Sequence, residues 1–252
     1  MEVLVYMYIE KAKDTQFWEK VRSCSDYAPF VKELLNIWEK DCTHDIPASK
    51  YSEYIIFDLT GSRTEYEQSY FTRRRAMNAS ALLSLIFPEE QKYHTKLCDV
   101  IWAILDEYNW VLPAHIGTFK ENRVAYIDLF AAETGFALSE IDYILGDRLP
   151  PLIRSRIRAE VDRRIIDAYT EDRKYWWEKC TNNWAAVCAC SVGIAFLYLH
   201  PRERSTMLLK DSKNHCEHRK RGLRISAYAN LQTIPFLVSF QNQLLSYAFF
   251  EV

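Results

Sequence analysis

Apolar residues recur at every fourth position between residues 153 and 165, and this spacing constrains the fold more than any other feature of the chain. The apolar residues are Ile153, Ile157, Val161 and Ile165. An α-helix completes a turn in about 3.6 residues, so these side chains share one face. The opposite face holds the charged residues Arg154, Arg158, Asp162 and Arg163. We therefore predict an amphipathic helix that starts at Pro150 and Pro151, where the first turn tolerates proline.

Other segments predict further helices, and together they place the chain in the all-α class. The predicted helices span residues 15–40, 64–87, 89 to about 108, 122–145 and 184–199. Pro29 breaks or kinks the first, Pro88 ends the second and Gly146 caps the fourth. Residues 41–62 are irregular and residues 110–117 form a loop. Only six of the 252 residues are glycine, which argues against the many turns of a β-sandwich or barrel.

The domain organisation follows from the short connections and from one change in composition. Short turns between helices favour successive antiparallel hairpins, arranged as a bundle or as a ring. After Leu199 the composition changes abruptly, because residues 202–224 are polar and basic and residues 225–250 are apolar and aromatic. We treat residues 1–200 as one helical domain. Residues 201–252 are a divergent tail, which we interpret as a frame-shifted or otherwise replaced end.

Charge and hydropathy argue against two classes of partner. The formal net charge is −2, so no strong field recruits nucleic acid or an anionic membrane. The apolar run from Trp184 to Leu199 is shorter than a bilayer crossing usually needs, and we interpret it as an inner helix of a bundle. The basic residues 202–224 carry no recognised nucleic-acid-binding motif, although a basic surface also suits an anionic polysaccharide.

The cysteines and the N-terminal residues predict a cytoplasmic protein with free thiols. Seven cysteines are present at irregular spacings, and Met1 to Lys11 lacks the apolar core of a signal peptide. Two groups contain metal-ligating side chains: Cys180, Cys188 and Cys190, and His215, Cys216 and His218. Neither group has the paired spacing of a metal site, so no metal or other cofactor is predicted.

Three segments resemble the heparinase II/III-like polysaccharide lyases. The first, residues 61–85, carries the pattern Tyr66, Tyr70, Phe71, Arg73 and Arg74. The second is IWAILDEYNWVLPAH, residues 101–115, similar to a W..P.H loop of that family. The third, residues 128–199, contains DLFAAETG, LGDRLP, TNNWAAVC and an apolar helix. Their order and spacing match over residues 45–199, and the resemblance implies an incomplete (α/α) toroid of helical hairpins.

The resemblance implies β-elimination on uronic-acid-containing glycans such as a glycosaminoglycan or alginate. A base removes the C5 proton beside the carboxylate, and the C4 glycosidic oxygen leaves. Preorganised donors stabilise the enolate-like charge, and a tyrosine or histidine handles the proton. By position, Asn182 and Asn183 match the charge-neutralising element, with Asn183 on the substrate carboxylate. His115 and Trp110 resemble substrate-contacting positions, as does Trp184, which stands where some relatives carry a histidine.

Two parts of the family pattern have no counterpart in this sequence. One is a glycine-rich segment of the form DGG..EG..YW.YG that carries the catalytic tyrosine, and the other is a C-terminal β-sandwich. We therefore expect either a truncated lyase or a non-catalytic remnant that binds acidic glycans. A helical scaffold unrelated to carbohydrate is the third alternative.

Each predicted site residue also has a purely structural explanation. Asparagine is favoured at helix N-caps, which would account for Asn182 and Asn183. A loop histidine such as His115 commonly bonds to backbone, and Trp110 and Trp184 would also suit a core. Exposure separates an aromatic sugar platform from a core aromatic ring.

Overall fold

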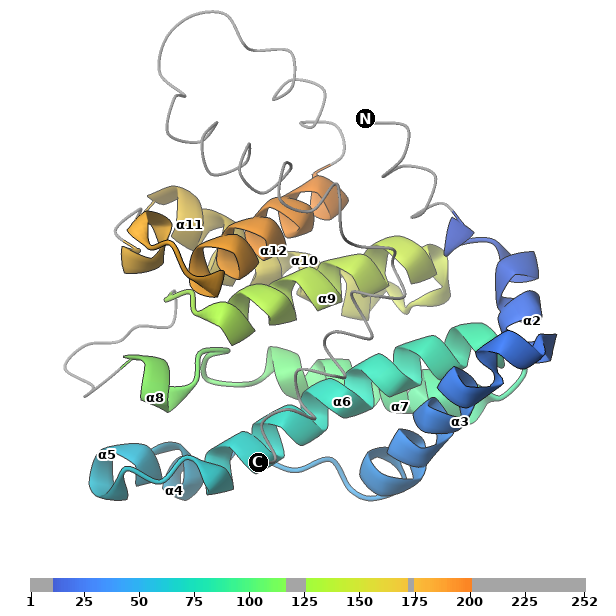
Figure 1. Cartoon of the computed structure of the whole chain (residues 1–252), viewed down its shortest axis with the longest axis horizontal. Coiled ribbons are helices and arrows are strands. Elements are labelled where there is room, and N and C mark those ends of the chain that lie inside the picture. The colour runs from blue at the N-terminus through green and yellow to red at the C-terminus, as the bar shows by residue number, and fades with distance from the viewer. Residues whose placement is uncertain (1–10, 117–125, 172–174, 201–252) are drawn as a thin grey trace, which may run out of the picture. The chain divides into compact units, whose positions relative to one another are not determined.

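The computed structural model describes residues 11–116, 126–171 and 175–200, and these ranges are helical without any strand (Figure 1). The all-α prediction is confirmed for this part of the chain. The chain divides after Glu107 into two compact units. The first contains the described residues 11–107, and the second contains the described residues from 108 to 200. The predicted tail, residues 201–252, lies outside the described residues.

The first described part of the first unit contains two helices where the sequence predicted one. The elements are α2 (Thr15–Ser23), a 3₁₀ turn (Ser25–Tyr27), α3 (Ala28–Ile37) and a π-helical turn (Trp38–Cys42). The break falls at Cys24, whose backbone is extended. Pro29 lies in the first turn of α3, where its missing N–H removes no helical hydrogen bond. The predicted interruption near Pro29 is therefore confirmed.

Two short helices lie in the stretch that was predicted to be irregular. α4 spans Tyr51–Tyr54 and α5 spans Ile56–Thr60. α5 ends at Gly61, whose φ of 77° lies in the left-handed region that glycine adopts without steric cost. Helices of one turn are too short to show an apolar period, which is why the sequence pattern missed them.

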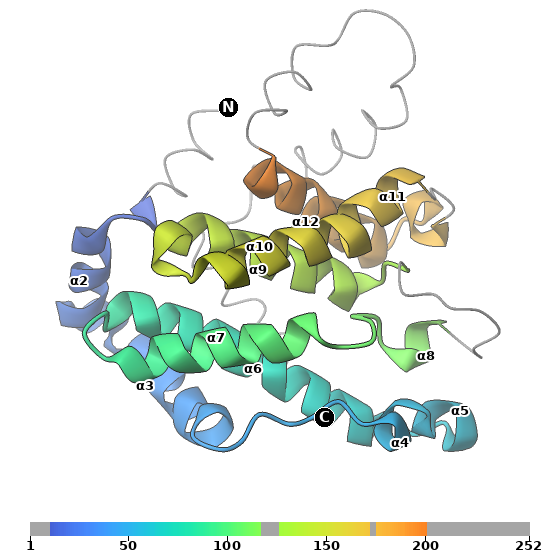
Figure 2. The same cartoon turned by 180° about the vertical axis from the view of Figure 1, so that it is seen from behind.

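Two long helices, α6 and α7, form the main pair of the first unit. α6 spans Thr64–Ile86 and α7 spans Gln91–Leu105, close to the predicted bounds, and they run side by side (Figures 1 and 2). Most of α6 is buried around its whole circumference. Arg73 and Arg74 on this helix are buried, and both bind the buried carboxylate of Glu107. The charges inside this core are thus paired with one another.

The second unit is built around α9 and α12. Its described α-helices are α8 (Pro113–Ile116), α9 (Leu129–Leu145), α10 (Pro151–Val161), α11 (Asp167–Glu171) and α12 (Asn183–Leu199). α9 and α12 lie side by side, and α10 packs against α9 (Figures 1 and 2). The predicted apolar face is buried and thus confirmed, and it continues into a π-helical turn at Asp162–Ile166: its members are Ile153, Ile157, Val161 and Ile165.

Three details of the second unit differ from the predictions. α9 begins at Leu129 and not near residue 122, because Asp128 has an extended backbone and caps the helix. The predicted loop 110–117 contains the short helix α8. α9, with its buried polar residues, is more deeply buried than the apolar α12. Hydropathy missed this because polar side chains of α9, such as Glu140, are hydrogen-bonded inside the unit.

Candidate functional site

The centre of the candidate site is a pair formed by His115 on α8 and Asp128 at the start of α9. Nδ1 of His115 lies 2.7 Å from Oδ2 of Asp128, which is fully buried. The same carboxylate accepts hydrogen bonds from the backbone N–H groups of Leu112 at 3.2 Å and Ala131 at 2.7 Å. An ionised carboxylate can only accept hydrogen bonds, so Nδ1 of His115 carries the proton. This tautomer leaves the lone pair of the neutral ring on Nε2.

Aromatic rings surround this imidazole. Phe130 stacks on His115 with ring centroids 5.7 Å apart, and Trp184 meets it edge-on at 5.0 Å. The ring centroid of Trp176 lies in turn 4.9 Å from that of Trp184. The side chain of His115 keeps 14% of its surface exposed, whereas that of Asp128 is fully buried, so only the imidazole of the pair reaches the surface of the unit.

The two asparagines at the start of α12 play different roles. Asn182 is the N-cap, and its Oδ1 accepts the backbone N–H of Trp184 at 3.1 Å and the thiol of Cys180 at 2.8 Å. The structural explanation therefore holds for Asn182. Asn183 is exposed, and within the described part of the chain no hydrogen bond occupies its amide. Asn183 is thus available to a ligand, whereas Asn182 is committed to the helix.

Trp110 is the predicted site residue that the structure does not bring to this surface. Its side chain is 1% exposed, and the guanidinium of Arg164 lies over its ring at 4.9 Å. This burial agrees with the alternative explanation, in which Trp110 is a core aromatic ring. Trp184, in contrast, is half-buried and contacts His115.

Two residues near the pair carry chemistry that the sequence did not single out. Glu133 follows Phe130 by three positions on α9, so the two share a face. Its Oε2 is buried with no hydrogen-bond partner among the described residues. Burial, and then the charge of Asp128, raise the pKa of Glu133 to about 7. Burial also raises the pKa of the Cys188 thiol, with further contributions from Asp128 and Glu133, so Cys188 is an unreactive thiol.

The spacing of Asp128, Phe130 and Glu133 could have pointed to this group. Asp128 is a favoured N-cap residue, and Phe130 and Glu133 follow it at positions that share a helix face. The helix was predicted to start earlier, near residue 122, and this start placed Asp128 inside it. An aspartate inside a helix gives no signal of a cap or of a histidine partner.

No protein-family model and no curated protein matches this chain. Among the described residues, no helix has both the length and the hydropathy needed to cross a bilayer. Over the same ranges, no three His, Cys, Asp or Glu side chains gather into a cluster that could hold a metal ion. The site offers an imidazole with a fixed tautomer, an exposed amide and indole rings. These groups can move a proton, donate hydrogen bonds to an anion and stack on a sugar ring.

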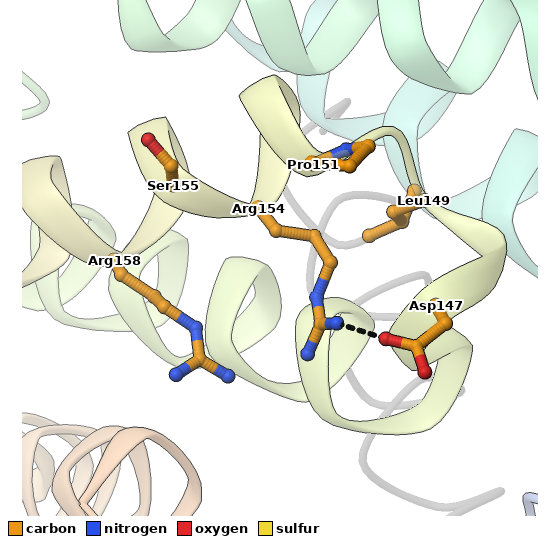
Figure 3. Close-up of a pocket in the computed structure, with 6 residues that line it drawn as sticks. All are labelled: Asp147, Leu149, Pro151, Arg154, Ser155 and Arg158. Atoms are coloured by element: carbon orange, nitrogen blue, oxygen red, sulfur yellow. Dashed lines mark hydrogen bonds and ion pairs between the residues drawn. The ribbon is translucent and has the colours of Figure 1, made fainter.

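An open pocket of about 540 Å³ lies elsewhere in the second unit, where the turn after α9 leads into α10 (Figure 3). Arg154 and Arg158 line it, and Figure 3 shows Arg154 directed towards Asp147. Arg154 binds Asp142 at 2.8 Å and Asp147 at 2.5 Å, and Arg158 binds Asp142 at 2.8 Å. Because these arginines are already neutralised, the pocket does not offer a free positive charge to an acidic sugar.

Proposed function

We propose that this chain is a polysaccharide lyase-type protein of the heparinase II/III class, with its glycan site at His115, Asn183 and Trp184. One observation carries the proposal. Two of the three segments that resemble the family, residues 101–115 and 128–199, contribute His115, Asp128 and Trp184 to one cluster of contacts. The proposal includes the family's toroidal arrangement of helical hairpins, of which α6–α7 would be one.

The proposed substrate is a glycan that contains uronic acids, and the proposed reaction is β-elimination. The exposed amide of Asn183 would donate hydrogen bonds to the sugar carboxylate and stabilise the enolate-like charge that develops there. His115 would take the C5 proton on Nε2, since Asp128 holds the proton on Nδ1. The electron pair of the C5–H bond then forms the double bond between C4 and C5 as the C4–O bond breaks. The glycosidic oxygen leaves with the electron pair of that bond and takes a proton from water.

The charges around the site are compatible with an acidic ligand. Asp128 is buried and its carboxylate accepts three hydrogen bonds, so much of its charge is already balanced. The raised pKa of Glu133, about 7, keeps a large share of this group neutral near neutral pH. Asn183 opens a helix of 17 residues, and the N-terminus of such a helix carries a partial positive charge.

Glycan binding without cleavage is the second candidate function. It is favoured by Trp184, which stands where some relatives carry a histidine, and by the lack of a DGG..EG..YW.YG segment in this sequence. Under this alternative Asn183 and Trp184 still contact the glycan, but the proton at C5 is not removed.

The test measures binding and cleavage separately. The full chain is titrated with heparin, heparan sulfate, chondroitin and alginate by calorimetry, and cleavage is followed by the ultraviolet absorbance of the unsaturated product. Binding with a rising absorbance supports the lyase, and binding alone supports the second candidate. If none of the four glycans binds, both candidates are wrong.

The two asparagines provide a matched pair of variants. Asn183→Ala should remove binding or cleavage while leaving stability unchanged, because none of the described residues bonds to that amide. Asn182→Ala should lower the free energy of unfolding by about 1 kcal/mol through loss of the cap. An Asn183→Ala protein that binds and cleaves like the wild type would remove Asn183 from the site.

A further inference from the structure

An exposed tryptophan that was not among the predicted site residues lies next to the proposed site. Trp176 opens the 3₁₀ turn at Trp176–Lys179, and 50% of its surface is exposed. It contacts Trp184, which contacts His115. The row of rings therefore runs from the His115–Asp128 pair out to solvent.

The local structure holds the Trp176 indole in one orientation. Its Nε1 donates a hydrogen bond to the hydroxyl of Tyr126 at 3.1 Å. The next residue, Trp177, is fully buried and donates from Nε1 to the carbonyl oxygen of Ile127 at 2.9 Å. Trp177 thus anchors the turn in the core, and its neighbour Trp176 faces outward. Fixing an indole in this way reduces the conformational entropy that a ligand would otherwise have to remove.

We propose that Trp176 is the stacking platform for a pyranose ring of the acidic glycan, in a subsite next to the one at Asn183 and His115. This inference rests on the proposed function. An indole presents a wide apolar face and a polar edge. The C–H face of a pyranose ring can lie on the indole face, while its hydroxyl groups and carboxylate remain free for polar partners. The contact with Trp184 makes this surface continuous with the proposed site. The aromatic role that the family resemblance assigned to Trp110 is therefore carried by Trp176.

The first experiment uses whichever of the four glycans binds to the wild type, and measures the affinity of the full chain for it. Trp176→Ala should weaken binding about tenfold, the size expected when one stacked ring is removed. Trp176→Phe keeps a ring and should recover most of that loss. Trp102→Ala is the matched control, since Trp102 is 41% exposed in the first unit, and it should bind like the wild type. A Trp176→Ala protein with unchanged melting temperature and unchanged affinity overturns the proposal.

A second experiment requires no variant and therefore does not depend on folding. Hydroxyl-radical labelling followed by mass spectrometry reports the exposure of each tryptophan in the wild-type chain. Bound glycan should reduce labelling of Trp176 several-fold and leave Trp102 unchanged. If the glycan binds and Trp176 is labelled as before, the stacking proposal is wrong while the proposed function stands. If no glycan binds, the proposed function fails and the platform fails with it.

Discussion

The carboxylate of Asp128 serves two structures at once: it caps helix α9 through Ala131 and holds the imidazole of His115 at 2.7 Å. A single buried side chain therefore links the start of α9 to the orientation of the proposed proton-transferring group. The backbone N–H of Leu112, just before α8, is the third donor to this carboxylate and connects that segment to the start of α9.

Asp128→Ala should be strongly destabilising. It removes the acceptor of two backbone N–H groups and of Nδ1 of His115, and the expected loss is roughly 2–4 kcal/mol of unfolding free energy. Asp128→Asn keeps an oxygen for the cap and should cost less. In that variant the Asn amide can donate to Nδ1, so the imidazole proton should move to Nε2. Urea unfolding measures the first effect, and ¹⁵N chemical shifts of His115 measure the second. A wild-type protein already protonated on Nε2 alone would contradict this assignment.

Glu140 should make the second unit less stable as pH rises. Burial raises its pKa from 4.5 to about 8, and Tyr198 donates a hydrogen bond to it at 3.0 Å. Between these two pH values the unfolded chain loses the proton before the folded chain does, so stability falls. The stability of the unit is therefore highest below about pH 4.5 and reaches its lower level above about pH 8. The shift corresponds to a fall on the order of 5 kcal/mol.

Glu140→Gln should flatten this dependence, because the amide still accepts the Tyr198 hydroxyl and does not titrate. Thermal unfolding from pH 4 to 9 measures the change, with the exposed Glu19→Gln as control. Glu133 should add a smaller fall that ends near pH 7. If wild type and Glu140→Gln show parallel profiles, Glu140 does not titrate as described.

Glu107→Gln should destabilise the first unit by about 3–5 kcal/mol. Its carboxylate lies between Arg73 and Arg74, and each of the three side chains is no more than 4% exposed. Removing the negative charge leaves two buried guanidinium groups without their counter-ion. Glu89→Gln is the matched control, since Glu89 pairs with Arg22 at the surface and should contribute less than about 1 kcal/mol. Urea unfolding compares the two, and equal losses would contradict the account of the buried cluster.

Gly135→Ala should lower stability by up to about 2 kcal/mol despite the better helix propensity of alanine. A Cβ at this position of α9 would lie 2.7 Å from Cγ1 of Ile165, a clash that costs about 1–3 kcal/mol before the propensity gain of about 1 kcal/mol is counted. Ile165→Ala removes that atom. The double variant should therefore lose less than the sum of the two single losses. Additive losses in a double-mutant cycle would show that the close approach does not matter.

Local sequence determined the helices with strong apolar spacing or clear boundary residues. α6 was predicted to within about a residue of its bounds, and the buried face of α10 follows from the spacing of Ile153 to Ile165. The N-cap role of Asn182 was also recognised as an alternative from its residue type. These features depend on hydrogen bonds and packing within a few residues, so a single segment carries the information.

Only the tertiary structure decided which of the predicted site residues are exposed. Trp110 and Trp176 are the same residue type, yet the first is buried under Arg164 and the second is half exposed. The partner of His115 lies thirteen residues away at a helix start that the sequence pattern placed earlier. Exposure and pairing depend on which other elements cover a side chain. The sequence by itself therefore determined the helical class and the residue types of the site, and the packing of α8, α9 and α12 decided which of those residues meet.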